Sequence, residues 1–457
     1  MRKTRENRKT VVDLTNGSIA KGIVSFAIPV FLGQLLQQLY NMADAWVVGN
    51  FADNDAFAAV SSSGSLIFFI TGFFSGIAIG GGVVISRYVG AGDKKMIERS
   101  IHTNFLFGIL ASVGATVVGL LLVPYLLVWM KVPESVVTNS YTYFSIYFAG
   151  VSTIIMYNVG MSILRALGDS IHPLYYLAIS SVTNVVLDLL FVAVFHWGVA
   201  GAAAATVISQ ALSAVLCIIQ MCCMKDETTR LCFRKIRFHK KIMLEVIRQG
   251  LPTGIQNSVI SIGNMVVQTN INSFGAFAMS GHGAYAKIEG LVFMPITSMS
   301  MTLPTFISQN LGAGKLDRAK RGAKFGILSG MLMAETVGVL CYFFATGALK
   351  FFVDTPEAIE FGRIHAGVVS LFFFLLAFSH CAAGVLRGCG KAIVPMITML
   401  AFWCGVRIIY VTQTIKFIPR FEVISWAYPL TWTLSSIVFL LFLLKSDWTS
   451  AWQKKGV

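Results

Sequence analysis

The segment Ser86–Gly92 reads SRYVGAG, and 222 residues further along the chain Ser308–Gly314 reads SQNLGAG. Unrelated apolar sequences match one another in leucine and valine through composition alone, but they do not share glycine, proline and arginine at fixed positions. The chain therefore consists of two repeats. The same offset aligns Gln34 with Gln256, Asn50 with Asn272, Arg99 with Arg321, Leu164–Arg165 with Leu386–Arg387, Gly168 with Gly390 and Pro173 with Pro395.

The composition excludes a soluble protein of several domains. The 457 residues are 56% hydrophobic and only 12% charged, whereas an average soluble domain contains roughly 25% charged residues. The mean hydropathy is +0.72. Between the clustered charges lie about a dozen apolar stretches, each long enough to cross a hydrocarbon layer of ~30 Å. The sequence therefore predicts a multi-pass membrane protein.

The two repeats predict six membrane spans each. Because six is an even number, both repeats enter the membrane in the same orientation, and their symmetry axis lies along the membrane normal. The predicted fold is an all-α polytopic membrane protein, with twelve transmembrane helices in two parallel six-helix repeats (an N-lobe and a C-lobe) related by a pseudo-twofold axis. We expect the spans near 22–48, 55–84, 99–125, 137–161, 171–195, 199–223, 244–272, 280–306, 322–347, 357–385, 391–415 and 421–445.

The net charge of +15 is explained by where the 36 lysines and arginines lie. All but seven fall in segments on the side of the N-terminus, and an excess of Lys and Arg marks cytoplasmic segments. We therefore expect both termini in the cytoplasm and the protein in the cell (inner) membrane, and we predict no nucleic-acid partner. The exceptions are Lys131, Lys350, Arg363, Lys416 and Arg420 on the other side, and Lys287 and Arg407 inside spans.

The predicted domain order follows from these spans. We expect a cytoplasmic leader at 1–21, an N-terminal lobe at 22–223, a basic cytoplasmic linker at 224–243, a C-terminal lobe at 244–445 and a cytoplasmic tail at 446–457. The leader has no cleavage pattern, so the first helix is interpreted as an uncleaved anchor. None of the eight cysteines falls in an expected outer loop, which predicts no structural disulfide. Those near the linker match no zinc spacing, so no metal site is predicted.

Polar residues form a stripe in the first and fifth spans, because they recur every three or four positions. An ionisable side chain costs at least about 2.5–3.5 kcal/mol at mid-membrane, so each one needs a role. Two carboxyl groups fall at similar depth, and close carboxylates in a low-dielectric medium do not both ionise easily. The pattern favours a site that takes up H⁺ or Na⁺ over carboxyl groups that only hold helices together. The stripes are Gln34, Gln37, Asn41 and Asp44, and Ser181, Asn184 and Asp188.

The second repeat carries a different set of polar residues. Its first span has an uncharged stripe, and Val406 and Tyr410 stand where the first repeat has Asn184 and Asp188. Other spans of this repeat contain charged residues. Among them, Glu289 and Arg407 could either pair with each other across the bundle or contact substrate. The uncharged stripe includes Asn257 and Asn264, with Gln256 beside it, and the C-lobe charges are Lys287, Glu289, Glu335 and Arg407.

Two further features bear on the mechanism. Pro29 lies near the start of the first span, where it removes a backbone hydrogen bond and permits either a static kink or a hinge. The sequence has no Walker motif and no nucleophile–base motif, so we expect no cofactor and an ion gradient as the energy source. Three hypotheses remain: an antiporter of drugs and ions, a flippase or exporter of anionic lipid-linked sugars, and, well behind them, a membrane enzyme or channel.

Several motifs resemble those of the multidrug and toxic compound extrusion (MATE) family. The likeness spans nearly the whole chain, in order and in both repeats. It implies twelve helices in two lobes and efflux of drugs in exchange for H⁺ or Na⁺. The motifs are Asp13–Ile19 (DLTNGSI) ahead of Ile28-Pro29, Gln37–Asp44 (QQLYNMAD), Gly198–Thr206 (GVAGAAAAT), Ser308–Lys315 (SQNLGAGK) and Leu386–Gly388 (LRG).

The resemblance implies where ions and substrate bind. Carried over from the DinF-like branch of the family, an ion-coupling site falls on Asp44, Asn184, Asp188, Thr206 and Tyr143. The sequence departs from the NorM-like branch, since Ile260 stands where that branch has an acidic residue. We therefore expect ion coupling in the N-lobe, and a substrate cavity lined by Gln34, Gln37, Asn41, Gln256, Asn257 and Asn264. The expected partners are the lipid bilayer and small organic cations or other amphipathic molecules, bound by a monomer.

Overall fold

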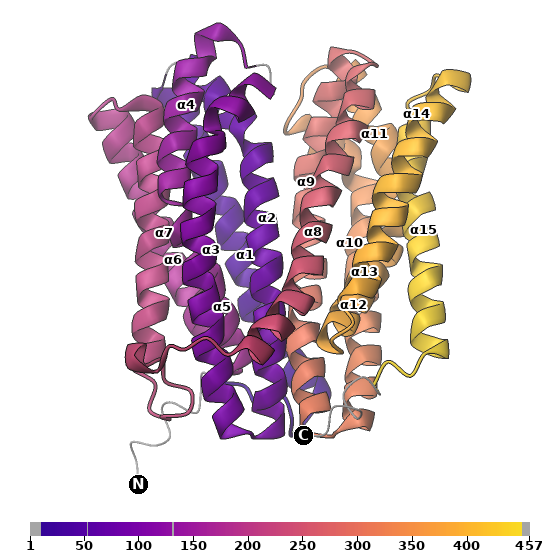
Figure 1. Cartoon of the computed structure of the whole chain (residues 1–457). Helices are drawn as coiled ribbons and strands as arrows, with labels where there is room; N and C mark the ends of the chain where they lie inside the picture. The colour runs from indigo at the N-terminus through magenta and orange to yellow at the C-terminus, as the bar shows by residue number, and fades with distance from the viewer. Residues whose placement is uncertain (1–10, 53, 130–131, 450–457) are drawn as a thin grey trace. The chain divides into compact units, whose positions relative to one another are not determined.

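The computed structural model describes residues 11–52, 54–129 and 132–449. Apart from one isolated β-bridge between Val11 and Asp169, these residues form helices and the turns that connect them. The predicted all-helical architecture of two repeats is confirmed (Figure 1).

Helices that follow one another across a short break combine into six passes per repeat. In the first repeat these are α1 (Ile19–Phe51), α2 (Asn54–Ala91), α3 (Lys94–Trp129), α4 (Glu134–Ala149) with α5 (Val151–Ala166), α6 (Ile171–Asp188) with the π-helix η2 (Leu189–Val194), and α7 (Gly198–Cys222). A short 3₁₀ turn, η3 (Phe233–Lys235), lies in the connection to the second repeat.

The second repeat follows the same order. Its passes are α8 (Lys240–Asn272), α9 (Ala276–Gly312), α10 (Leu316–Lys350), α11 (Pro356–Val369) with η4 (Ser370–Phe372) and α12 (Phe373–Gly388), α13 (Ile393–Met399) with the π-helix η5 (Leu400–Val406) and α14 (Arg407–Phe417), and α15 (Glu422–Lys445).

Length and composition make most of these passes able to cross a membrane. Ten helices are long and apolar enough singly, and the pair α4 and α5, bent by 43°, makes an eleventh candidate. The remaining pass is α8, whose polar stripe lowers its hydropathy. A helix this polar crosses lipid only if its polar side chains face other protein or water.

The repeated glycine motifs form matching helix ends. Gly92 after α2 and Gly314 after α9 have φ values of +67° and +70°, a left-handed conformation that glycine adopts without strain. The backbone N–H that follows each glycine donates back to the helix end, at 3.2 and 2.8 Å. Gly168 and Gly390 form a second matching pair, with φ values of +92° and +77°. Both Gly-Ala-Gly motifs therefore end their helices in tight turns.

The described residues form two compact units that exchange short segments. The first unit contains 11–13 and 28–254, and the second contains 14–27 and 255–449. The first turns of α1 thus belong to the second unit, and the first half of α8 belongs to the first unit. This division refines the lobes predicted from the repeat, because it assigns each of these two helices to both units.

Glycines explain why the first half of α8 packs within the first unit. A Cβ atom at Gly80 of α2 would lie 2.2 Å from the backbone nitrogen of Gly250, and one at Gly76 would lie 2.5 Å from that of Gly254. Two glycines four residues apart on each helix therefore let the backbones of α2 and α8 touch. Just beyond this contact, the carboxylate of Glu245 lies 3.7 Å from the Arg87 guanidinium.

Candidate functional site

Asp44 and Asp188 approach each other in the first unit. Asp44 lies in the second half of α1, and Asp188 is the last residue of α6. Asp188 is fully buried, Asp44 is partly buried, and the two carboxyl groups interact electrostatically. Among the described residues, neither carboxyl group forms a salt bridge with a lysine or arginine. Two acidic groups without a neutralising cation can share a proton or bind a monovalent cation.

Apolar packing holds this pair in place. Val47 and Val48, one turn beyond Asp44, pack in one cluster with Val192 of η2 and Ala202 of α7. The cluster holds the second half of α1 against η2, which follows Asp188 directly, and against α7.

Aromatic hydroxyl groups surround the acidic pair. Tyr143 on α4 is 5% exposed and interacts electrostatically with both carboxyl groups. Its ring stacks on Tyr147 at a centroid distance of 6.3 Å. Tyr40, one turn before Asp44, accepts a hydrogen bond from Nε2 of Gln210 at 3.4 Å. These phenols supply oxygen atoms and movable protons beside the carboxyl groups.

Asn184 lies one turn before Asp188 on the same face of α6. Its side chain is buried, yet neither its amide nitrogen nor its amide oxygen has a hydrogen-bond partner among the described residues. Both oxygens of Asp188 are in the same condition. Buried polar atoms are nearly always paired, so unpaired ones at one place indicate a site that is completed by something else, such as a proton, an ion or water.

The helix changes its winding directly after Asp188. The next residues, Leu189–Val194, form a π-helix, a conformation that occurs mostly as short bulges and is frequent at functional sites. The second repeat also contains a π-helix, Leu400–Val406, which ends directly before Arg407. In each repeat, therefore, an ionisable residue inside a predicted span lies next to a π-helix, where the regular α-helical hydrogen bonding is interrupted. This residue is Asp188 in the first repeat and Arg407 in the second.

The other predicted N-lobe residues have more ordinary surroundings. Thr206 on α7 donates its hydroxyl to the carbonyl oxygen of Ala202, 3.0 Å away, and among the described residues it forms no hydrogen bond with Asp44 or Asp188. On α1, Gln34 is partly buried, whereas Gln37 and Asn41 are exposed. Pro29 lies inside α1 and is buried. Of the polar stripe on α1, Asp44 thus belongs to the acidic pair, while the amides of Gln37 and Asn41 remain accessible.

In the second unit, the predicted amides lie on α8. The Nε2 of Gln256 donates to the sulfur of Met399, 2.9 Å away. Asn257 is partly buried, and its carbonyl oxygen accepts the hydroxyl of Ser261 at 3.0 Å. Asn264 is exposed. Gln256 therefore faces the interior of its own unit, while Asn264 remains accessible.

Glu289 and Arg407 of the C-lobe do not form a salt bridge with each other. Glu289 and Arg407 interact electrostatically, but the guanidinium of Arg407 hydrogen bonds to the hydroxyl of Thr431 (2.9 and 3.3 Å) and stacks on the ring of Tyr428 at 4.5 Å. The salt bridges formed by the described residues do not include this pair. Lys287 is exposed, and its ammonium lies 5.3 Å from the ring centre of Phe352.

Glu335 has a structural partner. Its carboxylate accepts the backbone N–H of Phe374 at 3.1 Å, at the start of α12 directly after the 3₁₀ turn η4. A carboxylate at the start of a helix satisfies a free N–H and complements the helix dipole.

A buried histidine network in the second unit was missed by the sequence reasoning. His365 of α11 is fully buried, with its Nδ1 2.9 Å from the hydroxyl of Ser425. Its ring lies 4.9 Å from that of His282 on α9. The hydroxyl of Tyr285 lies 2.9 Å from that of Ser370. The spacing of His282, Tyr285 and Glu289, three and then four residues apart, places them on one face of α9 and was the available signal.

Two helical repeats of six passes, each holding ionisable side chains within its apolar helices, define a membrane transporter. The model of the MatE family matches residues 29–190 and 252–411, which cover the corresponding part of each repeat. The chain belongs to the MATE family, and it is a transporter rather than an enzyme.

Two relatives from Bacillus subtilis (strain 168) match most of the chain. The probable multidrug resistance protein YpnP is 27% identical over 392 residues, covering 86% of this chain and 87% of its own. The probable multidrug resistance protein YoeA is 26% identical over 452 residues, covering 96% of each. Among solved structures, a transporter of the MOP superfamily from Pyrococcus furiosus superposes with a TM-score of 0.89 at 21% identity, over 97% of this chain and 99% of that one. That likeness concerns the fold.

Proposed function

We propose that the chain is a secondary active antiporter that exports amphipathic, mostly cationic organic compounds in exchange for H⁺ or Na⁺. The observation that carries the proposal is the pair Asp44 and Asp188, buried together beside the unpaired amide of Asn184 with no salt bridge to a lysine or arginine of the described chain. A site of this kind changes its charge when it takes up a cation. The names of the Bacillus relatives support drugs as the exported cargo.

In the proposed mechanism, the empty pair carries negative charge and attracts a cationic substrate. Uptake of H⁺ or Na⁺ cancels that charge, so the substrate loses its electrostatic attraction and is released on the outer side. The two conformations must differ in their affinity for the ion, since a ligand shifts an equilibrium only through differential binding. Asn184 and Tyr143 supply an amide and a hydroxyl group that stabilise one form of the pair, and Thr206 takes part only if its hydroxyl leaves the Ala202 carbonyl.

The α1 helix is the element that we propose to move. It carries Asp44, and it contains Pro29 where it passes from the second unit to the first. Proline removes one backbone hydrogen bond inside a helix and lowers the resistance to bending. A change of charge at Asp44 therefore acts on a helix that is already weakened at one point.

The exposed amides provide polar groups for substrate along the same helices. Gln37 and Asn41 lie on α1 before Asp44, and Asn264 lies on α8. We propose that they line the substrate cavity together with Gln34 and Asn257, whereas Gln256, buried and bonded to Met399, supports α8 from inside its own unit. Amphipathic cations then gain hydrophobic burial, a few directed hydrogen bonds and attraction to the acidic pair.

We further propose that a monomer works in the cell (inner) membrane with both termini in the cytoplasm. The support is the distribution of lysine and arginine, which collects on the side of the two termini.

A second candidate function is the export or flipping of anionic lipid-linked sugars. It is favoured by Arg407, a buried cation that has no salt bridge among the described residues. Such a group could bind a phosphate bidentately. Its bonds to Thr431 and its stacking on Tyr428 favour instead a role in holding α14 against α15.

Transport in liposomes separates the two. The purified protein is reconstituted with a pH-sensitive dye inside, and proton and Na⁺ gradients are imposed separately while ethidium is added. Ethidium-dependent loss of the proton gradient supports H⁺-coupled antiport, and transport driven only by Na⁺ supports Na⁺ coupling. If neither gradient moves ethidium while a labelled lipid-linked sugar is translocated, the antiporter proposal is wrong.

A further inference from the structure

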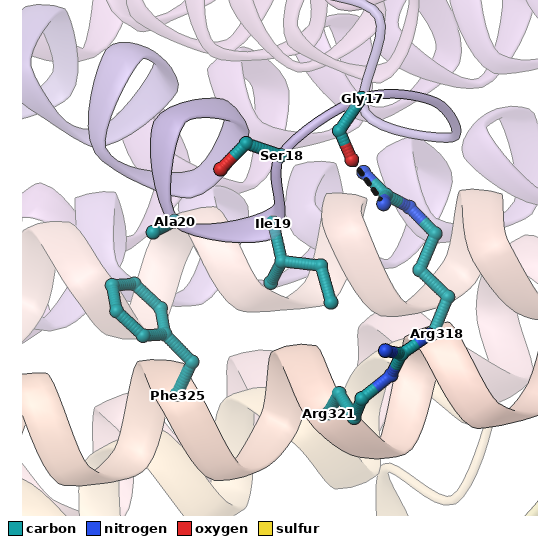
Figure 2. A pocket seen from close by; sticks show the side chains of 7 residues that line it. All are labelled: Gly17, Ser18, Ile19, Ala20, Arg318, Arg321 and Phe325. Atoms are coloured by element: carbon teal, nitrogen blue, oxygen red, sulfur yellow. Dashed lines mark hydrogen bonds between the residues drawn. The ribbon is translucent and has the colours of Figure 1, made fainter.

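A pocket of about 480 Å³ lies in the second unit, between the start of α1 and the first turns of α10. Figure 2 shows its lining. On α10, three side chains at spacings of three and four residues share one helix face and form one wall. The opposite wall is the turn that leads into α1. The lining residues are Gly17, Ser18, Ile19, Ala20, Arg318, Arg321 and Phe325.

One of the two arginines is fixed. The guanidinium of Arg318 donates to the carbonyl oxygens of Leu14 (3.2 Å), Asn16 (2.9 Å) and Gly17 (2.6 Å). The Leu14 carbonyl also accepts the amide of Asn310 at 3.0 Å. Arg318 therefore holds the segment before α1 in place and keeps its positive charge at the edge of the pocket.

The other arginine is available to a ligand. Arg321 is exposed, and no described carboxylate forms a salt bridge with it. Arg321 lines the pocket, and in Figure 2 its side chain runs along α10 so that its guanidinium ends beside the stem of Arg318. An unpaired guanidinium in a concave site offers several N–H donors in a geometry that suits phosphate oxygens.

The surroundings of the pocket are basic. Lys315, Lys320 and Lys324 flank the two arginines along the start of α10, against the single acidic residue Asp317. Such an excess of positive charge attracts an anion before it makes any specific contact.

The remaining lining is apolar. Ile19, Ala20 and Phe325 form this part, and Figure 2 shows the Phe325 ring on the side of the pocket near Ala20. A ligand that fits has a phosphate for the arginines and an uncharged portion for this surface. Basic pockets beside membrane helices bind the headgroups of anionic lipids by this combination.

We propose that this pocket binds a phosphate group through Arg321, with Arg318 fixed at its edge. A phosphate diester of a membrane phospholipid and a soluble phosphate compound share this chemistry. In either case the occupant contacts both the start of α1 and the start of α10. The site is separate from the acidic pair and from the C-lobe charges.

The test measures binding to the full-length protein in detergent by native mass spectrometry. The probes are dioctanoyl phosphatidylglycerol, dioctanoylglycerol (the same chains without phosphate) and glycerol 3-phosphate. The variants are Arg321→Ala, Arg321→Lys and, as a matched control, Lys324→Ala, which removes a positive charge from the same helix one turn from Arg321 and does not line the pocket. Cross-linking of a photoreactive phosphatidylglycerol to the wild type locates the site without relying on any variant.

We expect Arg321→Ala to weaken binding of phosphatidylglycerol roughly tenfold, the loss typical of a charge-assisted hydrogen bond, with a smaller loss in Arg321→Lys and in Lys324→Ala. Cross-links are expected near Ser18–Ala20 or Phe325. If glycerol 3-phosphate binds with the same dependence on Arg321, the natural ligand is a soluble phosphate, and if it does not bind, the ligand is a lipid. The proposal is overturned if dioctanoylglycerol binds as tightly as the phospholipid, if both alanine variants lose binding equally, or if the cross-links fall elsewhere.

Discussion

Pro29 and Pro252 lie one residue from equivalent positions in the two repeats, and each is within three residues of the point where its helix passes from one compact unit to the other. Pro29 belongs to α1 and Pro252 to α8, the first helix of each repeat. A proline inside a helix interrupts one backbone hydrogen bond. The helices α1 and α8, which each belong partly to both units, therefore lack a backbone hydrogen bond close to the point where they pass from one unit to the other.

Replacing Pro29 by alanine should slow transport without destabilising the protein. The substitution restores a backbone donor and stiffens α1. We expect ethidium transport in liposomes to fall severalfold, while the melting temperature of the purified protein stays equal or rises. Pro429→Ala is the control, because Pro429 lies inside α15, which belongs to one unit throughout. Equal losses in the two variants would show that Pro29 has no special role as a hinge.

Adding one methyl group at Gly80 should destabilise the first unit. The new Cβ would lie 2.2 Å from the nitrogen of Gly250, where only backbone movement can make room. We expect a loss of about 1–3 kcal/mol, seen as a lower melting temperature. Gly114→Ala on α3 is the matched control, since no heavy atom lies within 4 Å of its Cβ position, and alanine there should be neutral or stabilising. A Gly80→Ala protein that melts with the wild type would contradict the close helix contact.

Asn184→Ala should shift the pH dependence of export. The amide of Asn184 is buried without a hydrogen-bond partner among the described residues, one turn before Asp188 on α6. Its NH₂ group can donate to an ionised carboxylate and favour that form. Without it the balance between the ionised and neutral forms of the pair should change, so we expect the pH optimum of export to shift. Transport rates measured from pH 5 to pH 9 test this, and an unchanged profile would remove Asn184 from the site.

Arg407→Ala should lower stability and leave the choice among cationic substrates unchanged. The guanidinium connects α14 to α15 through Thr431 and Tyr428. Losing a buried charged hydrogen-bonding group typically costs about 1.5–3 kcal/mol, which a melting curve detects. The order of transport rates for ethidium and other cations serves as the second readout. A stable variant with an altered order of substrates would instead place Arg407 in the substrate cavity.

Much of the fold could be predicted from sequence, because it depends on local patterns. The offset between Gly90–Gly92 and Gly312–Gly314 predicts the repeat, and in the structure the two motifs form equivalent left-handed turns that end α2 and α9. Polar spacing places Asp44 and Asp188 on defined helix faces at similar depth, and the structure brings the two together.

The rest depends on packing between distant segments. The exchange of helix starts between units requires contacts such as Gly80 with Gly250, which no local pattern specifies. The π-helix after Asp188 interrupts regular winding without a proline or glycine in Leu189–Val194 to mark it. The histidine network joins α9, α11 and α15, and the sequence does not specify which distant helices pack together. The sequence shows only that His282, Tyr285 and Glu289 share one face of α9.

Proton-coupled transport by Asp44→Asn is the most direct test of the central claim, that the acidic pair couples ion uptake to export. Three proteins are reconstituted under one imposed proton gradient with ethidium outside: the wild type, Asp44→Asn and the control Asp226→Asn. The control alters an exposed carboxylate that is bonded to Thr228 in the linker between the repeats. The amide keeps the size of Asp44 but cannot take up a cation by neutralising charge. We predict that ethidium discharges the gradient in the wild type and in Asp226→Asn and not in Asp44→Asn, with all three proteins equally folded. Full discharge by Asp44→Asn would contradict the account.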